Sequence, residues 1–165
     1  MEPTDIFKKR DFSKVNFDYE EMIGRNLSNS NLKGVDLKNR DIHNANLSGT
    51  DLSGADLTDT ILFNVKLRGA NLQNTKLVNA KLWDTDLYGV DLTNANISGA
   101  DLFYADLRNA DLRNTNLSGV NFRHANFEGA TFTSIDFTNA NYDLQTLDTI
   151  SKDIKVILEM QGNLW

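Results

Sequence analysis

Residues 45–64 read ANLSG, TDLSG, ADLTD and TILFN in succession. The third residue of each block is a leucine, and a large apolar residue recurs at every fifth position from Phe12 to Tyr142 without a slip. This series contains 27 consecutive units in a chain of 165 residues. A period of five fits neither the 3.6-residue turn of an α-helix nor the alternation of a strand. It therefore predicts a stacked repeat, in which each unit buries its apolar residue only against its neighbours.

The other positions of the unit are specific as well. We call the large apolar residue the centre. The residue two before the centre is mostly small, the residue one before it is mostly Asp or Asn, and the residue two after it is mostly Gly or Asn. Nine of the ten glycines occupy this last position. A corner with positive φ selects Gly first and Asn second, so each unit is a short extended segment followed by a corner.

The motif Ala-(Asp/Asn)-Leu-X-X, seen at residues 55–59 and 100–104, resembles that of the pentapeptide-repeat proteins. The resemblance covers residues 10–144. It implies an all-β solenoid, a right-handed quadrilateral β-helix with four units per 20-residue coil and nearly seven coils. At about 4.8 Å per stacked strand the rod is about 32 Å long. Residues 20 apart then lie above one another on the same side.

The repeat divides the chain into three segments. Residues 1–11 are expected to cover the N-terminal end, 12–144 to form the β-helix, and 145–165 to form a C-terminal helix or cap. Asp143 or Thr146 is expected to cap the start of that helix. The helix serves as a lid on the last coil, as an element of a homodimer, or as both. Its apolar candidates for these contacts are Leu147, Ile150, Ile154, Ile157, Leu158 and Trp165.

Charged residues interrupt the small inward position near the N-terminus. Glu20 and Arg40 both lie two residues before a centre and are 20 residues apart, so they should stack on one side of the rod. An unpaired charge at this inward position would be costly in an apolar interior. We therefore expect this coil to be open or distorted, with Arg40 reaching Glu20 or solvent.

The composition narrows the classes of partner. The net charge of −6 disfavours direct nucleic-acid binding, and no apolar run is long enough to span a membrane. Cysteine is absent, which removes disulfides and thiolate metal sites. Since the first ten residues contain no apolar stretch of the kind found in secretion signals, we expect a cytoplasmic protein.

One column of apolar residues occupies a position that should face solvent. Stacked aromatic residues stabilise a solenoid by themselves, but a contiguous stripe more often marks an interface. A partner protein, a second subunit or the C-terminal helix are the possible occupants. The column, one residue after the centre, holds Ile23, His43, Phe63, Trp83 and Phe103, and we expect Ile61, Tyr88 and Tyr104 to lie close to it.

Carboxylates form a second candidate set. Acidic pairs 20 apart could hold a divalent cation, but Asp and Asn share this position freely, which favours hydrogen bonding to the backbone. The alternative function is that of a DNA mimic that binds and protects a type II topoisomerase, gyrase, as some proteins of the resembling family do. The residues concerned are Asp84, Asp86, Asp91, Asp101, Asp106 and Asp111.

Catalysis has the weakest support. The only histidines, His43 and His124, are 81 residues apart, about four coils or 19 Å along the rod. No nucleophile or phosphate-binding motif is present. We therefore expect no catalytic residue, no cofactor and no metal site. The sequence favours a rigid binding surface or regulatory scaffold for another, unidentified protein.

Overall fold

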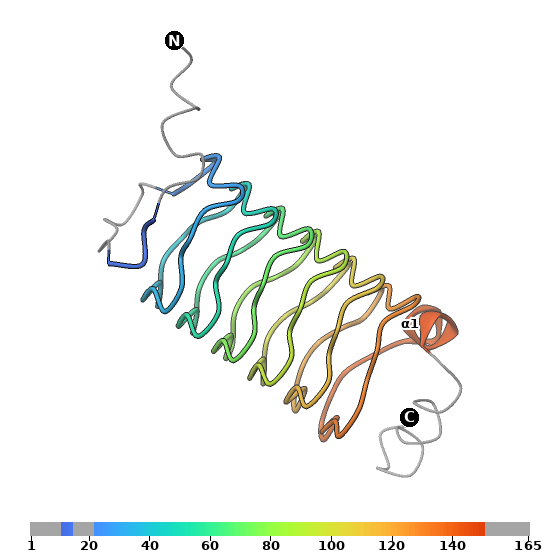
Figure 1. The fold of residues 1–165 in the computed structure, drawn as a ribbon. Helices are drawn as coiled ribbons and strands as arrows, with labels where there is room; N and C mark the ends of the chain where they lie inside the picture. The colour runs from blue at the N-terminus through green and yellow to red at the C-terminus, as the bar shows by residue number, and fades with distance from the viewer. Residues whose placement is uncertain (1–10, 15–21, 151–165) are drawn as a thin grey trace.

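The computed structural model describes residues 11–14 and 22–150, which form a rod of stacked rectangular coils (Figure 1). Parallel β-bridges always join residues 20 apart, from Asp11↔Asn31 to Asn121↔Asn141. One coil therefore takes 20 residues and has four sides, one for each unit of five. This register confirms the solenoid predicted from the sequence.

Each corner has the predicted backbone conformation. The residue two after the centre has positive φ in every unit from Gly24 to Asn139, with values between 53° and 72°. A turn hydrogen bond closes the corner, as from the Ala55 N–H to the Leu52 carbonyl at 2.9 Å. Neighbouring coils are joined by backbone hydrogen bonds such as that from the Leu57 N–H to the Lys76 carbonyl, 2.7 Å. The corners and the ladders together satisfy the backbone of the rod.

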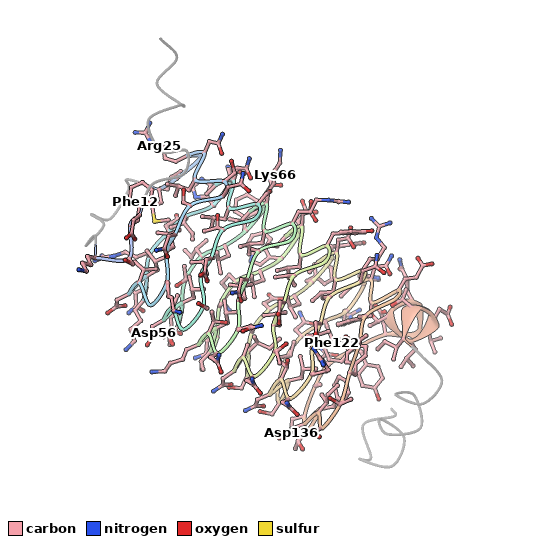
Figure 2. All side chains as sticks on the ribbon, in the orientation of Figure 1. Phe12, Arg25, Asp56, Lys66, Phe122 and Asp136 are labelled. Atoms are coloured by element: carbon pink, nitrogen blue, oxygen red, sulfur yellow. The ribbon has the colours of Figure 1, made fainter. Side chains whose placement is uncertain are left out.

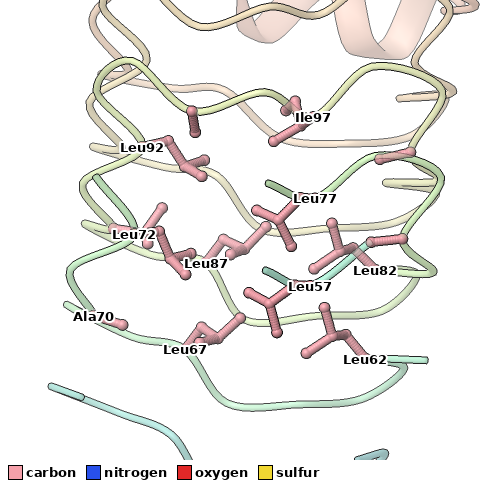
Figure 3. Close-up of a cluster of buried hydrophobic side chains, with 14 of the residues drawn as sticks. Leu57, Leu62, Leu67, Ala70, Leu72, Leu77, Leu82, Leu87, Leu92 and Ile97 are labelled. Carbon is pink, nitrogen blue, oxygen red and sulfur yellow. The ribbon is translucent and has the colours of Figure 1, made fainter. Parts of the chain in front are cut away.

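The interior is filled by the centres and by the small residues. Figure 3 shows Leu57, Leu62, Leu67 and Leu72 in one coil beneath the matching leucines of the next. Threonines replace alanines at some small positions and are buried as well. Thr60 Oγ1, for example, donates to the Leu37 carbonyl at 2.8 Å, so its hydroxyl group is satisfied inside the rod.

Polar side chains point outward, and Asp56 and Lys66 project from opposite margins of the rod (Figure 2). The Asp or Asn before each centre accepts a hydrogen bond from the N–H two residues later. Asp86 Oδ1 accepts from the Tyr88 N–H at 3.1 Å in this way. The prediction that Asp and Asn at this position form hydrogen bonds with the backbone is thus confirmed.

A short helix, α1 (Leu144–Thr149), closes the C-terminal end of the rod (Figure 1). Asp143 is its N-cap and accepts from the Thr146 N–H at 2.8 Å, as predicted. Ile150 is buried and Leu147 packs on the core, whereas the remaining cap candidates Ile154, Ile157, Leu158 and Trp165 lie outside the described residues. Within the described residues, no helix has the length and apolar character needed to cross a bilayer.

The N-terminal coil is described only in part. Arg40 is half-buried and is not sealed in the core, which agrees with the predicted access of its charge to solvent. Glu20 lies outside the described residues, as does most of the predicted N-terminal cap, 1–11.

Candidate protein-binding side

Most of the large apolar residues that remain exposed lie on one side of the rod. Among the described residues there are four: Ile61, Trp83, Tyr104 and Leu144 are 38, 42, 55 and 80% exposed. The 20-residue register places the first three in three successive coils of the same side, whereas Leu144 is the first residue of α1, beyond the last coil. We call this side of the rod the aromatic side. It carries the predicted apolar column.

Rings stack along the aromatic side at the spacing of the coils. The His43 and Phe63 centroids are 5.6 Å apart at 20° between planes, and the Phe63 and Trp83 centroids are 4.9 Å apart at 24°. Ile23, half-buried, begins the column. Because each ring covers the face of its neighbour, the ring edges are turned to the outside. Such a surface suits flat apolar contact with a protein.

A second group of rings lies towards the C-terminal end. Tyr104 stacks on His124 at 4.7 Å and 17°, and Phe103 meets both rings edge-on. Tyr104 and His124 occupy corner positions, with φ of 59° and 60°. Left-handed backbone disfavours bulky side chains, and the other described residues with positive φ are Gly, Asn, Asp or, once, Ser134. The two rings are therefore placed here against the local backbone preference.

Asp143 joins this ring group to α1. His124 Nδ1 lies 3.0 Å from Asp143 Oδ2 and 2.9 Å from Gln145 Oε1, and the His124 N–H donates to Asp143 at 3.2 Å. Burial by itself would raise the pKa of Asp143, but hydrogen bonds from Thr146 and His124 outweigh it and lower that pKa. His43 has a similar neighbour, with its Nδ1 2.7 Å from Asp41 Oδ1.

Lys81, Asp84, Asp101 and Arg123 on the aromatic side form no ion pair with a residue that the structure describes. Lys81, Asp84 and Arg123 are exposed. Their positions flank Trp83 and Tyr104. Asp101, half-buried, accepts from Asn121 at 2.9 Å. The aromatic side thus combines exposed rings with unpaired charges of both signs.

Tyr88 requires a correction, since we expected it close to the apolar column. It lies on the next side, because one unit of five residues separates it from Trp83 and a corner intervenes. The Arg68 guanidinium lies 3.9 Å from its ring centroid and that of Arg108 lies 5.6 Å away. Tyr88 thus belongs to a separate cation–π contact.

The six carboxylates of the acidic candidate set do not form one surface. The register distributes them over three sides of the rod, two on each. Arginines two residues later pair with two of them, at 2.7 Å for Arg108–Asp106 and 2.6 Å for Arg113–Asp111. These guanidinium groups lower the pKa of both carboxyls. No group of three His, Asp or Glu suited to a metal ion occurs among the residues that the structure describes.

The site also includes residues that the sequence reasoning did not assign to it. His124 continues the aromatic side beyond Phe103, and Lys81 and Arg123 provide its cations. The signal was available in the register, because His124 follows Tyr104 by 20 residues. The departure of Tyr104 and His124 from the Gly/Asn preference of the corner was a second signal.

Comparison with known proteins identifies the family. A family model described as pentapeptide repeats matches with eight copies, over residues 26–59, 41–77, 66–102 and 104–141. The crystal structure of a pentapeptide-repeat protein, Rfr23, from the cyanobacterium Cyanothece 51142 aligns with a TM-score of 0.52 at 26% identity, covering 76% of this chain and 96% of that chain.

Two further solved structures are similar. HetL of Nostoc sp. strain PCC 7120, a pentapeptide-repeat protein involved in heterocyst differentiation regulation, has a TM-score of 0.31 at 26% identity over 81% of this chain and 58% of its own. QnrB1, a plasmid-mediated fluoroquinolone resistance protein, has a TM-score of 0.42 at 15% identity, and the alignment covers 94% of this chain and 95% of that chain. No curated protein sequence matches. Since the family model covers more than half of the residues, the chain belongs to the pentapeptide-repeat family of right-handed quadrilateral β-helices.

Proposed function

We propose that this protein is a non-catalytic rigid rod that binds another protein through its aromatic side. One observation carries the proposal: three of the four large apolar residues that are exposed in the described structure, Ile61, Trp83 and Tyr104, fall on that side. Single exposed apolar residues need no explanation, but their concentration on one of four sides does. The family assignment gives a scaffold for such a surface and supplies no catalytic group.

The rod favours binding because it is already ordered. The ladders of hydrogen bonds fix Phe63, Trp83 and Phe103 at strand spacing before any partner arrives. Association therefore costs little conformational entropy on this side of the interface. The strained corners of Tyr104 and His124 support the same view, because the backbone cost is accepted where the rings reach the surface.

Site-specific crosslinking tests the proposal. A photo-reactive phenylalanine analogue at Trp83 is expected to form protein adducts in the host cell. Gln73 provides the matched control, since it occupies the same position of its unit ten residues earlier, which is the opposite side of the rod. Adducts at position 83 but not at position 73 support the proposal, and equal yields at both positions, or none, would refute it.

The alternative function, a DNA mimic that protects gyrase, receives less support. A mimic needs a continuous negative surface, whereas Asp106 and Asp111 are neutralised by neighbouring arginines and the carboxylates are spread over three sides. A supercoiling assay with purified gyrase separates the two functions. Protection of gyrase from inhibition would overturn our choice.

The C-terminal homodimer also stays a proposal. In the described part of the chain, α1 covers the last coil, and Thr146 and Ile150 are buried against it. Leu144 is the exposed large apolar residue of α1, which leaves it available for a partner.

A further inference from the structure

The aromatic side carries charges of both signs, and a twofold rotation would bring opposite charges of two copies of this side face to face. Lys81 and Asp101 occupy the same position of their units in adjacent coils, joined by a β-bridge, yet they form no ion pair with each other. We propose that the aromatic side binds a second copy of this chain, with the two rods side by side and antiparallel. The inference rests on the proposed function, because it names the partner of that binding side.

Equal spacing is the first argument for a second copy. Side chains on this side repeat with each coil, about every 4.8 Å. A partner whose side chains repeat at the same interval can match every coil at once without strain. Another β-helix of this kind has that interval, and a second copy has it over the same number of coils. Antiparallel packing keeps the match from one end of the contact to the other.

Charge complementarity fixes the position of the twofold axis. An axis at right angles to the rods, midway between the coils of Trp83 and Phe103, leaves each position of the unit facing the same position in the other copy. Lys81 then faces Asp101 of the second copy, and Asp101 faces its Lys81. Each ion pair is made twice, as an isologous interface requires.

The same axis brings the rings and the remaining charges into favourable pairs. Trp83 faces Phe103 of the second copy across the axis. One coil further out, Arg123 faces the edge of the Phe63 ring, where its apolar stem can pack while its guanidinium stays in water. Asp84 faces Tyr104, whose hydroxyl group can donate to a carboxylate. Lys81, Asp84 and Asp101, which form no ion pair in the single rod, thus each acquire a complementary neighbour.

Other axes fail on the same charges. An axis through the coil of Lys81 sets Lys81 and Asp84 against their own copies, and one through the coil of Asp101 sets two Asp101 carboxylates together. An axis one coil nearer the N-terminus places Asp41 opposite Asp101. Like charges across an interface disfavour association, which rejects these three axes. An axis one coil nearer the C-terminus sets Lys81 opposite Asn141 and Asp101 opposite Asn121, so only the central axis pairs Lys81 with Asp101.

Charge reversal tests this arrangement by sedimentation equilibrium. Lys81→Asp and Asp101→Lys should each weaken the dimer about tenfold or more, because each places like charges together at two symmetric sites. The double variant should restore the dimer, since the pairs form again with their signs exchanged. Both residue types are already accepted at this position of the unit, as Lys66 and Asp86 show, so the folded rod is expected to persist.

Lys66→Asp and Asp86→Lys supply the control. These residues are also 20 apart and bridged, but they lie on the neighbouring side. They reproduce any repulsion within one rod and should leave the dimer unchanged. A milder variant, Asp101→Asn, removes the charge but keeps a side-chain oxygen. That oxygen can still accept the hydrogen bond that the Phe103 N–H donates to Asp101 Oδ1 at 3.2 Å.

The outcomes separate this inference from the proposed function. A dimer lost in both single variants and restored in the double variant establishes the second copy. A wild-type protein that sediments as a monomer at every concentration, or a dimer equally sensitive to both sets of reversals, overturns it. If the monomeric protein still forms adducts with another protein at position 83, the aromatic side is a binding surface and only the choice of partner is wrong. If position 83 forms no adduct, the proposed function fails as well.

Discussion

Thr146 Oγ1 donates a hydrogen bond of 2.9 Å to the carbonyl of Phe122, from a helix to the last complete coil of the rod. Threonines inside the rod donate the same kind of hydrogen bond to a carbonyl of the preceding coil, as Thr85 Oγ1 does to the Leu62 carbonyl at 2.9 Å. Thr149 Oγ1, in contrast, accepts a hydrogen bond of 3.0 Å from the Phe127 N–H. Side chains of α1 thus replace the groups that a further coil would offer, which closes an edge otherwise open to aggregation.

Thr146→Val should destabilise the rod by about 1 kcal/mol, because it removes a buried hydroxyl group and keeps the side-chain shape. The loss is moderate, since the Phe122 carbonyl still accepts from the Ala125 N–H at 3.1 Å. Urea unfolding measures the difference. The same change at the exposed Thr133 is the control. Equal effects at the two positions would show that the hydroxyl of Thr146 does not hold the cap.

Acid should weaken the attachment of α1 through Asp143. Its pKa is lowered in the folded protein, so the stabilisation is fully present above the unfolded pKa of about 3.9 and is lost as the pH falls through the lower, folded value. Asp143→Asn should reduce stability at neutral pH and flatten its decline below about pH 4. Urea midpoints across this range check the prediction. Parallel curves for the two proteins would contradict it.

The corner glycines should differ in their tolerance of alanine. Gly99 and Gly54 share a φ of 68°, so Ala costs about 1 kcal/mol of backbone strain at either position. A Cβ at Gly99 would also lie 2.5 Å from Asn79 Oδ1, whereas one at Gly54 meets nothing within 4 Å.

Asn79 is held by a hydrogen bond of 3.2 Å to Asp59, and its displacement should add about 1 kcal/mol to the cost of Gly99→Ala. Thermal unfolding of the two variants compares these costs. Asn79→Ala should remove the extra penalty at Gly99. A penalty that persists in the double variant would exclude Asn79 as its source.

Tyr104→Asn should separate stability from binding. Asn is the commonest non-glycine residue at these corners, so the change relieves strain of about 1 kcal/mol while losing the stack on His124, worth about as much. We expect the free energy of unfolding to change by less than about 1 kcal/mol and association through the aromatic side to weaken. Chemical denaturation and sedimentation together test this. An unchanged association constant would remove Tyr104 from the binding side.

The period of five predicted the coil, the corners and the stacking of residues 20 apart, because each depends only on position within the unit. It also predicted that His43, Phe63 and Trp83 form one column, in which the structure has Trp83 exposed and the other two residues half-buried. Local hydrogen bonding was equally accessible, since Asp143 occupies a recognisable helix-capping position. These features follow from short-range geometry that the repeat holds constant.

Other features depend on how side chains choose between neighbours. Arg108 pairs with Asp106 two residues earlier, on the same outer face of one strand, a contact that the 20-residue register does not specify. The repeat places Tyr88 across a corner from Trp83, but it does not specify that the Tyr88 ring contacts Arg68 and Arg108. Thr146 in α1 donates the hydrogen bond that an inward threonine of a further coil would donate. This role depends on the direction in which α1 crosses the end of the rod, and the five-residue period does not continue into α1.

The fluorescence of Trp83 tests the central claim, that the aromatic side is a binding surface, most directly. The chain has two tryptophans, so Trp165→Phe leaves Trp83 as the single reporter at the middle of that side. On concentration from a dilute solution, we expect its emission to shift to shorter wavelength and its quenching by acrylamide to fall, as a second copy excludes water. Adding Lys81→Asp should abolish both changes. Emission and quenching that stay constant at every concentration and with every bound protein would contradict the account.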